Sequence, residues 1–168
     1  MESESNGRAA RARALRGRQP LAPPDVLLIG RLGERPVALP GASVERVLQM
    51  VALTPVPDLP PPVVGVINIQ GSVLAVVDPR PSLDIPTAPW RLEQRLVLVR
   101  AATRYALWLD AAERIVRVAP EALQPVTSGA VMALAPLLAR LDGEVIPVLS
   151  PSAFDPGPIL VSAGERAG

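Results

Sequence analysis

Two runs of β-branched and aliphatic residues flank a short turn in the middle of the chain, in the segment VVGVINIQGSVLAVVD. The runs 63–69 and 73–77 contain mostly residues that strands favour, and the tripeptide QGS between them is typical of a tight hairpin turn. Gly71 gives that turn its backbone freedom, and Asp78 ends the second run in a turn or capping position. The segment predicts a β-hairpin, which has to pack against further strands to be stable.

A similar pattern recurs later in the chain. A shift of 72 positions places Gly71 on Gly143, and the dipeptide formed by Asp142 and Gly143 is the strongest two-residue signal for a hairpin turn. A shift of 68 positions places the tripeptide ERV at 45–47 on ERI at 113–115. The matches occur in the same order at nearly the same spacing. They indicate a duplicated unit of about 70 residues, and hence two similar small barrels side by side.

The rest of the chain is predicted to be all-β with short helical turns, because few segments keep a helical period beyond two turns. Ser43 suits the N-cap of one such helical turn, which would carry Val44 and Val47 on one face. Trp90, in the linker between the blocks, either fills the gap between the barrels or anchors a partner. Three further hairpins are expected, from the strand pairs 26–29 with 35–39, 95–99 with 104–109, and 137–141 with 144–149, and another strand is expected at 114–118.

The domain organisation follows from these patterns. Residues 1–24 contain few bulky apolar residues and end in prolines, which predicts a disordered, Arg-rich N-terminal arm. Residues 25–155 form the folded domain, with one subdomain at about 25–85 and the other at about 92–155. Residues 156–168 are expected to form a flexible C-terminal tail.

The composition argues against catalysis. The chain contains no histidine and no cysteine, which removes the commonest general base, the commonest metal ligand, disulfides and thiolate chemistry. No nucleophile elbow, phosphate-binding loop or metal-ligand spacing is present. We therefore expect no catalytic residue, no bound metal and no cofactor. The lack of cysteine also fits the reducing cytoplasm.

Charge and hydropathy bear on nucleic acids and membranes. Residues 1–20 carry five of the 17 arginines and two glutamates, whereas the rest of the chain carries 12 arginines and 14 acidic residues. The body is therefore not a basic platform, and we expect no nucleic acid as partner. The alternative is an SH3-like barrel that binds nucleic acid through its Arg-rich arm. The uncharged stretch 59–77 is interrupted by prolines and a glycine, so no membrane insertion is expected.

The segment TPVPDLPPPVVGVINIQGSVLAVVDPR, residues 54–80, resembles the CheW-like domain of chemotaxis adaptor proteins and of the regulatory domain of CheA histidine kinases. It shares the TP-x-P start, a run similar to GVINLRG and a strand that resembles VVDLR. Later in the chain, YALWLDAAERIVRV and LDGEVIPVL resemble a strand pair and the closing hairpin of that family. The resemblance covers approximately residues 25–154. It implies two five-stranded, SH3-like barrels packed side by side.

The resemblance also implies a function: a non-enzymatic cytoplasmic adaptor in a bacterial chemosensory pathway. Such an adaptor binds the regulatory domain of a CheA-like histidine kinase with one barrel. It binds the cytoplasmic tip of a methyl-accepting chemoreceptor, or a divergent equivalent, at the groove between the barrels. The residues implied on the receptor side are Val44, Arg46, Val47 and Gln70, and those implied on the kinase side are Val63, Val64 and Gly65.

The residues themselves leave several roles open. Val44 and Val47 are either core residues or partner contacts, because periodicity does not separate the two. Gly65 serves either backbone packing or a partner. The chain also departs from the family pattern, with Gln70 in place of arginine and Arg46 in place of glutamate. These two departures change the charge of the receptor side and suggest a divergent partner. Other departures are Pro79, Leu137 and Ser150.

Overall fold

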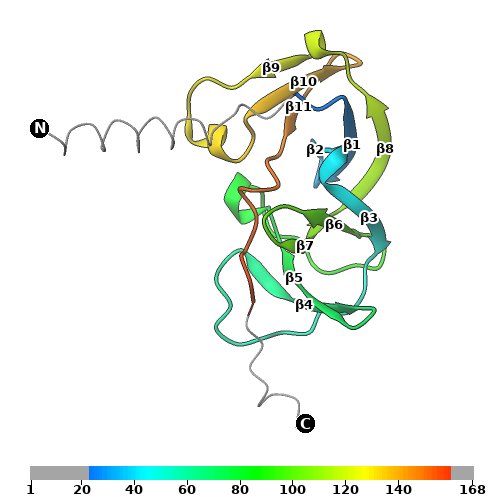
Figure 1. Ribbon diagram of the computed structural model, residues 1–168, viewed down its shortest axis with the longest axis vertical. Coiled ribbons are helices and arrows are strands. Elements are labelled where there is room, and N and C mark those ends of the chain that lie inside the picture. Colours follow the sequence, from blue (N-terminus) through cyan, green and yellow to red (C-terminus); the bar gives the residue numbers. More distant parts are fainter. Residues whose placement is uncertain (1–22, 160–168) are drawn as a thin grey trace, which may run out of the picture.

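The computed structural model describes residues 23–159. Nearly all of the expected arm 1–24 and most of the expected tail 156–168 therefore lie outside the described residues. The described part of the chain contains β-strands joined by turns and short 3₁₀ helices (Figure 1). The strands are β1 (Val26–Leu32), β2 (Arg35–Pro40), β3 (Val44–Gln49), β4 (Val63–Ile69), β5 (Ser72–Val77), β6 (Arg95–Arg100), β7 (Arg104–Leu109), β8 (Ala111–Arg117), β9 (Leu123–Pro125), β10 (Leu137–Leu141) and β11 (Glu144–Val148). The 3₁₀ helices are η1 (Gly41–Ser43), η2 (Pro81–Leu83), η3 (Pro120–Ala122) and η4 (Ala130–Ala133).

The four predicted hairpins are all present. They are the antiparallel pairs β1–β2, β4–β5, β6–β7 and β10–β11. In the β4–β5 turn, φ is 49° at Gln70 and 86° at Gly71, and in the β10–β11 turn it is 50° at Asp142 and 79° at Gly143. Positive φ at both central residues defines a type I′ turn, whose twist matches that of the flanking strands.

The expectation of a helical turn after Ser43 is wrong. The 3₁₀ helix η1 ends at Ser43, and the following residues form strand β3, which pairs antiparallel with β6. The ladder with β6 supplies the backbone hydrogen-bond partners that a helix would have found within itself. Tertiary pairing thus overrides a local capping signal, as it commonly does for weak propensities.

The strands form two sheets, which lie one above the other in Figure 1. Sheet A has the order β8-β1-β2-β11-β10-β9, and sheet B has the order β3-β6-β7-β5-β4. The sheets do not follow the sequence blocks 25–85 and 92–155. Instead the hairpin β1–β2 of the first block lies between β8 and β11 of the second, and the hairpin β6–β7 of the second block lies between β3 and β5 of the first. Each sheet therefore needs strands from both blocks.

The pairing registers of the two sheets repeat, which supports the internal duplication. Arg46 of β3 pairs with Leu98, and Arg114, 68 positions after Arg46, pairs with Ile29. The parallel pair of Val76 with Ala106 in sheet B recurs in sheet A as the pair of Val148 with Ala38. Sheet A differs by one extra strand, β9, so its strand number is six rather than the expected five.

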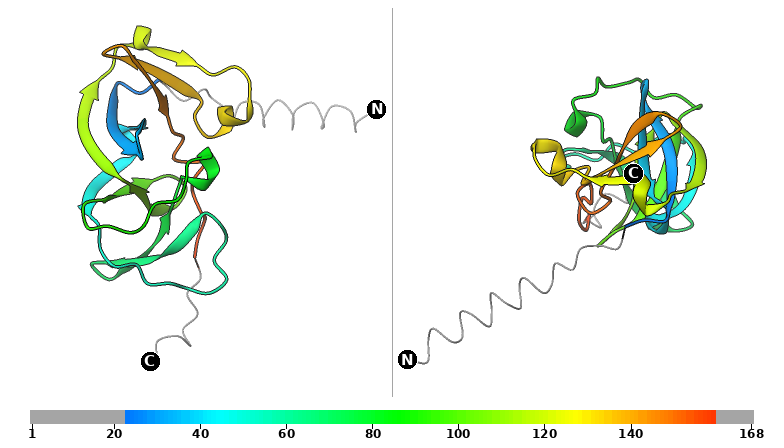
Figure 2. Two further views of the ribbon diagram at one scale, coloured as in Figure 1. Left: turned by 180° about the vertical axis from the view of Figure 1, so that it is seen from behind. Right: turned by 90° about the horizontal axis from the view of Figure 1, so that it is seen from above.

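The core is layered because both faces of the central strands are buried. Along β6, Leu96 and Leu98 point into a cluster inside sheet B, whereas Val97 and Val99 point into a cluster shared by the two sheets. A third cluster, which includes Ile146 of β11, fills the inside of sheet A. Within the described residues, the ladders end at the edge strands and do not close either sheet into a hydrogen-bonded barrel. The sheets instead pack through the side chains of the shared cluster. Figure 2 shows the strands from behind and from above.

Candidate docking surfaces

Three of the residues expected on the receptor side lie on β3, an edge strand of sheet B. Val44 is half-buried and packs against the core cluster that the two sheets share. Val47 is 37% exposed, and Arg46 is exposed as well. Among the described residues, Arg46 has no side-chain hydrogen bond or ion pair. Val47 and Arg46 are therefore accessible to a partner, whereas Val44 is mainly a packing residue.

The fourth expected residue, Gln70, lies in the β4–β5 turn and is exposed. The turn is stabilised locally, because the Asn68 side-chain oxygen accepts a hydrogen bond of 2.9 Å from the amide of Gly71. In the described part of the chain, no hydrogen bond joins Gln70 to β3. The amide side chain of Gln70 is thus available to a partner, as a donor or as an acceptor.

An ion-pair group lies beside these residues on sheet B. Glu45 accepts hydrogen bonds from Arg104, with an Oε1–Nη2 distance of 2.6 Å, and from Arg100, with an Oε2–Nε distance of 3.3 Å. The Arg104 hydrogen bond is the main cause that lowers the pKa of Glu45, and Arg100 adds to it. One carboxylate is thus shared by two guanidinium groups, and the group keeps a net positive charge.

The residues expected on the kinase side differ in accessibility. Val63 is 9% exposed and belongs to the shared core cluster, while Val64 next to it is 41% exposed. Gly65 is buried, and a Cβ at this position would lie 2.9 Å from the carbonyl oxygen of Thr54. Thr54 forms an isolated antiparallel bridge with Val66, which holds the preceding loop against β4. Of the three residues, only Val64 is open to a partner.

A buried polar network, which the sequence interpretation missed, lies beside the inner core of sheet B. Arg80 is fully buried and pairs with Asp78, at an Nη1–Oδ1 distance of 3.0 Å, and with Asp110, at an Nη2–Oδ1 distance of 2.7 Å. Its guanidinium carbon lies 4.9 Å from the centre of the Trp108 ring, a cation–π distance. Asp78 also accepts a hydrogen bond from the amide of Arg80, within a short turn after β5.

The network links the two sheets through Asp110. Its carboxylate accepts hydrogen bonds from the amide of Gly33, in the β1–β2 turn of sheet A, and from the side chain of Gln94. Burial alone would raise the pKa of Asp110, but Gly33, Arg80 and Gln94 together hold that pKa below its usual value. Asp110 is therefore a structural anion. The adjacent charges of the DPR segment at 78–80 point to a local ion pair in the sequence, but no sequence pattern indicates that Arg80 also pairs with Asp110.

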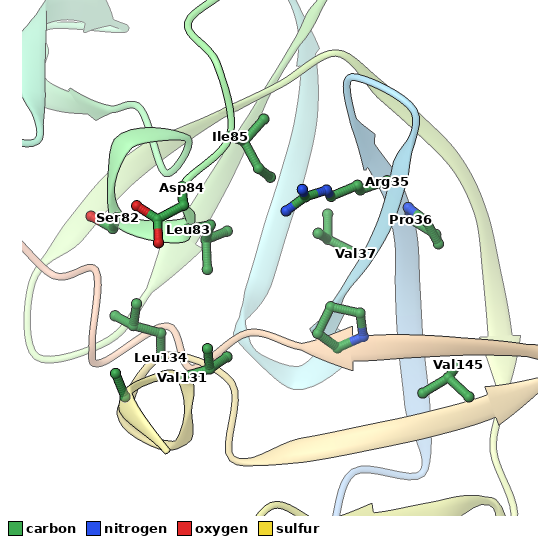
Figure 3. Close-up of a pocket in the computed structure, with 12 residues that line it drawn as sticks. Arg35, Pro36, Val37, Ser82, Leu83, Asp84, Ile85, Val131, Leu134 and Val145 are labelled. Carbon is green, nitrogen blue, oxygen red and sulfur yellow. The ribbon is translucent and has the colours of Figure 1, made fainter.

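An apolar groove of about 350 Å³ lies between β2, β11, η2 and η4 (Figure 3). Its floor and walls include Val37, Leu83 and Leu134, and its charged lining residues are Arg35 and Asp84. The described residues contain no group of three or more potential metal ligands. The mainly apolar lining of the groove suits an apolar side chain. No helix within residues 23–159 has the length and hydropathy needed to cross a bilayer.

Trp90 does not fill the gap between the sheets. Its ring is 43% exposed, and its indole nitrogen donates a hydrogen bond of 3.0 Å to the carbonyl oxygen of Val51. Val51 itself is exposed, and so is Leu92, two positions after Trp90. The ring is held against the loop that follows β3, which leaves the other interpretation, an anchor for a partner, as a prediction.

The chain is thus a protein of two packed β-sheets whose described surface carries exposed aliphatic residues and ion pairs. The family model of the CheW-like domain matches residues 26–155. The chain belongs to the CheW-like family, and its class is that of a chemotaxis adaptor or scaffold.

The fold agrees with a solved structure. The scaffolding protein TtCheW from Thermoanaerobacter tengcongensis is similar with a TM-score of 0.71 and 20% sequence identity. The similarity covers 77% of this chain and 91% of that chain. At this level of identity, the likeness concerns the fold. No curated protein sequence matches the chain significantly.

Proposed function

We propose that the chain is a cytoplasmic adaptor that couples a CheA-type histidine kinase to a chemoreceptor or a receptor-like partner. The observation that carries this proposal is the CheW-like domain over residues 26–155, together with its two-sheet architecture. An adaptor needs two separate surfaces that are open at the same time. The edge strand β3 and the β4–β5 turn expose Arg46, Val47 and Gln70 for one partner, and strand β4 exposes Val64 for the other.

On the receptor side, the accessible residues are Arg46 and Val47 of β3 and Gln70 of the β4–β5 turn. On the kinase side, the accessible residue is Val64. Arginine is among the residues that carry most of the binding energy of protein interfaces, and exposed aliphatic side chains add apolar contact area around such anchors. The remaining candidates are half-buried or buried and pack beneath these exposed residues: Val44, Val63 and Gly65.

The receptor side is tested by Val47→Asp in a titration against a soluble receptor-tip fragment. We expect affinity to fall by about tenfold or more, because a charge replaces an apolar contact at the centre of the interface. The matched control is Ile115→Asp, at the repeat-equivalent and more exposed position of β8, which should leave binding unchanged. Equal losses for both variants would contradict the assignment of β3.

The kinase side is tested in the same way with Val64→Asp and the purified regulatory domain of a CheA-type kinase. Ile115→Asp, at an exposed position of β8, is the control. Circular dichroism should be unchanged for both variants, since both side chains face solvent. A chain that binds the regulatory domain equally well with either substitution would remove Val64 from the proposed interface.

A further inference from the structure

The two repeats differ in one ion pair at the ends of their hairpins. In the second repeat, Arg114 of β8 lies 3.1 Å from Asp142 of the β10–β11 turn, between Nη2 and Oδ2. The same shifts that superimpose the repeats, 68 positions for β8 and 72 for the hairpin, place these residues on Arg46 and Gln70. The first repeat therefore has the same arginine, but an uncharged amide where the second repeat has its carboxylate.

The registers show why this correspondence is spatial as well as sequential. Arg114 is opposite Ile29, which points into the inner core of sheet A, and Arg46 is opposite Leu98, which points into the inner core of sheet B. Both arginines thus extend from the inner side of an edge strand. Both hairpin turns are of type I′, so they present their first central residue with the same backbone geometry.

The charge balance of the two ends differs as a result. The set in sheet B contains three cations and one anion, and the matching set in sheet A contains two cations and two anions. The aliphatic surroundings are alike, because both ends expose a valine or isoleucine on the edge strand and a valine in the hairpin. The first set is Arg46, Arg100, Arg104 and Glu45, and the second is Arg31, Arg114, Glu113 and Asp142.

We propose that Arg46 is a specificity-determining residue that binds a carboxylate of the partner, so that the partner's contact surface is acidic at this point. The inference rests on the proposed function, in which β3 and the β4–β5 turn form the receptor side. A guanidinium covered by a partner without an acceptor would lose its hydration uncompensated, whereas a carboxylate offers two matched oxygens. In the second repeat, the carboxylate that pairs with the equivalent arginine, Arg114, comes from Asp142 of the same chain. In the first repeat, Gln70 leaves the anion to be supplied by the other molecule.

The geometric premise is tested without any partner, on the full chain. In the Gln70→Asp variant, NMR titration should give the introduced carboxyl a pKa below its ordinary value, because Arg46 stabilises the charged form. Adding Arg46→Gln should return that pKa towards the ordinary value. An introduced carboxyl with the same pKa in both backgrounds would overturn the inference.

The partner chemistry is tested by titration with two versions of one probe: the cytoplasmic tip fragment of a chemoreceptor from the same genome, and the same fragment with its exposed Glu and Asp replaced by amides. Arg46→Glu should weaken binding to the acidic fragment by about tenfold or more, and Gln70→Asp by about threefold or more, since each cancels the open positive charge. The control Arg114→Glu should change affinity by less than about twofold. Binding to the amide fragment should not depend on Arg46.

The outcomes separate the two hypotheses. Binding of the acidic fragment that is unaffected or strengthened by Arg46→Glu overturns the inference and leaves the adaptor function in place. A wild-type chain that binds neither fragment overturns the proposed receptor side, and the inference with it. Loss of binding to the acidic fragment alone, with the control intact, supports both.

Discussion

At the scale of single residues, packing decides which of the candidate contacts a partner can reach. Gly65 matches the family pattern and is a candidate contact for the kinase, but packing within the chain explains why this position is a glycine. Leu53 and Thr54 cross over β4 so closely that even a methyl group at position 65 would meet the Thr54 carbonyl at 2.9 Å and the Leu53 Cβ at 3.3 Å. The close approach of one backbone to another accounts for the glycine. The kinase-side hypothesis therefore depends on Val64.

We expect Gly65→Ala to destabilise the chain by about 1–3 kcal/mol, the usual cost of overpacking a site that cannot expand. Urea denaturation monitored by circular dichroism measures the change. The control is Val64→Ala at the adjacent exposed position, which should change the free energy of unfolding by less than about 1 kcal/mol. A neutral Gly65→Ala variant would show that the crossing loop moves aside freely.

At the scale of elements, residues 149–157, which follow β11, form a strap that connects the two sheets. Phe154 is buried in the shared core, and the hydroxyl of Tyr105 in β7 donates a hydrogen bond of 2.6 Å to the Pro151 carbonyl. Asp155 accepts hydrogen bonds from the side chain and the amide of Thr103, in the β6–β7 turn, and from the amide of Gly157. The strap thus ties the end of sheet A to a hairpin of sheet B.

The hydrogen bonds of Asp155 in the strap predict that the free energy of unfolding decreases in acid. Burial acts to raise the pKa of Asp155, but the hydrogen bonds from Thr103 and Gly157 outweigh it and hold that pKa below its usual value. A carboxyl with a lowered folded-state pKa stabilises the fold above its unfolded pKa, about 3.9, and this contribution is lost as the pH falls through the folded pKa. We expect the free energy of unfolding of the wild type to fall below about pH 4.

Urea titrations between neutral and acidic pH measure this dependence. Asp155→Asn should lower stability at neutral pH and make the acid loss shallower, because the variant has no proton to take up at this site. Glu144→Gln, at an exposed position of β11, is the control and should keep the wild-type dependence. An Asp155→Asn variant with the full wild-type acid loss would assign the pH dependence to other carboxyls, such as Asp110.

At the scale of the whole molecule, the exchange of the hairpins β1–β2 and β6–β7 between the blocks makes the two sheets depend on each other. Sheet A contains two strands of the first block, and sheet B contains two strands of the second. A duplicated chain without exchange would give two units that fold separately. Here the middle core layer and the polar network around Asp110 join the sheets as well.

We therefore expect a fragment of residues 25–85 to lack a cooperative unfolding transition, because β1 and β2 would lose their neighbours β8 and β11. The full chain should unfold in a single transition. Thermal denaturation followed by circular dichroism compares the two. A fragment that melts cooperatively would mean that the sheets are separable, and that the exchange adds little stability.

The sequence by itself determined the hairpins, the turn positions and the duplication, because these depend on local β-propensity, turn chemistry and spacing along the chain. It also pointed to the family through residues 54–80. Tertiary structure alone decided which strands share a sheet, since β3 has its ladder partner, β6, in the other sequence block. It also decided which candidates are accessible. Val47 and Val64 are exposed, whereas the loop that contains Leu53 and Thr54 covers Gly65, and no periodic pattern in the sequence predicts that contact. The pairing of Arg80 with Asp110 is of the same kind, because a contact between buried charges depends on how the strands pack, and no local pattern encodes it.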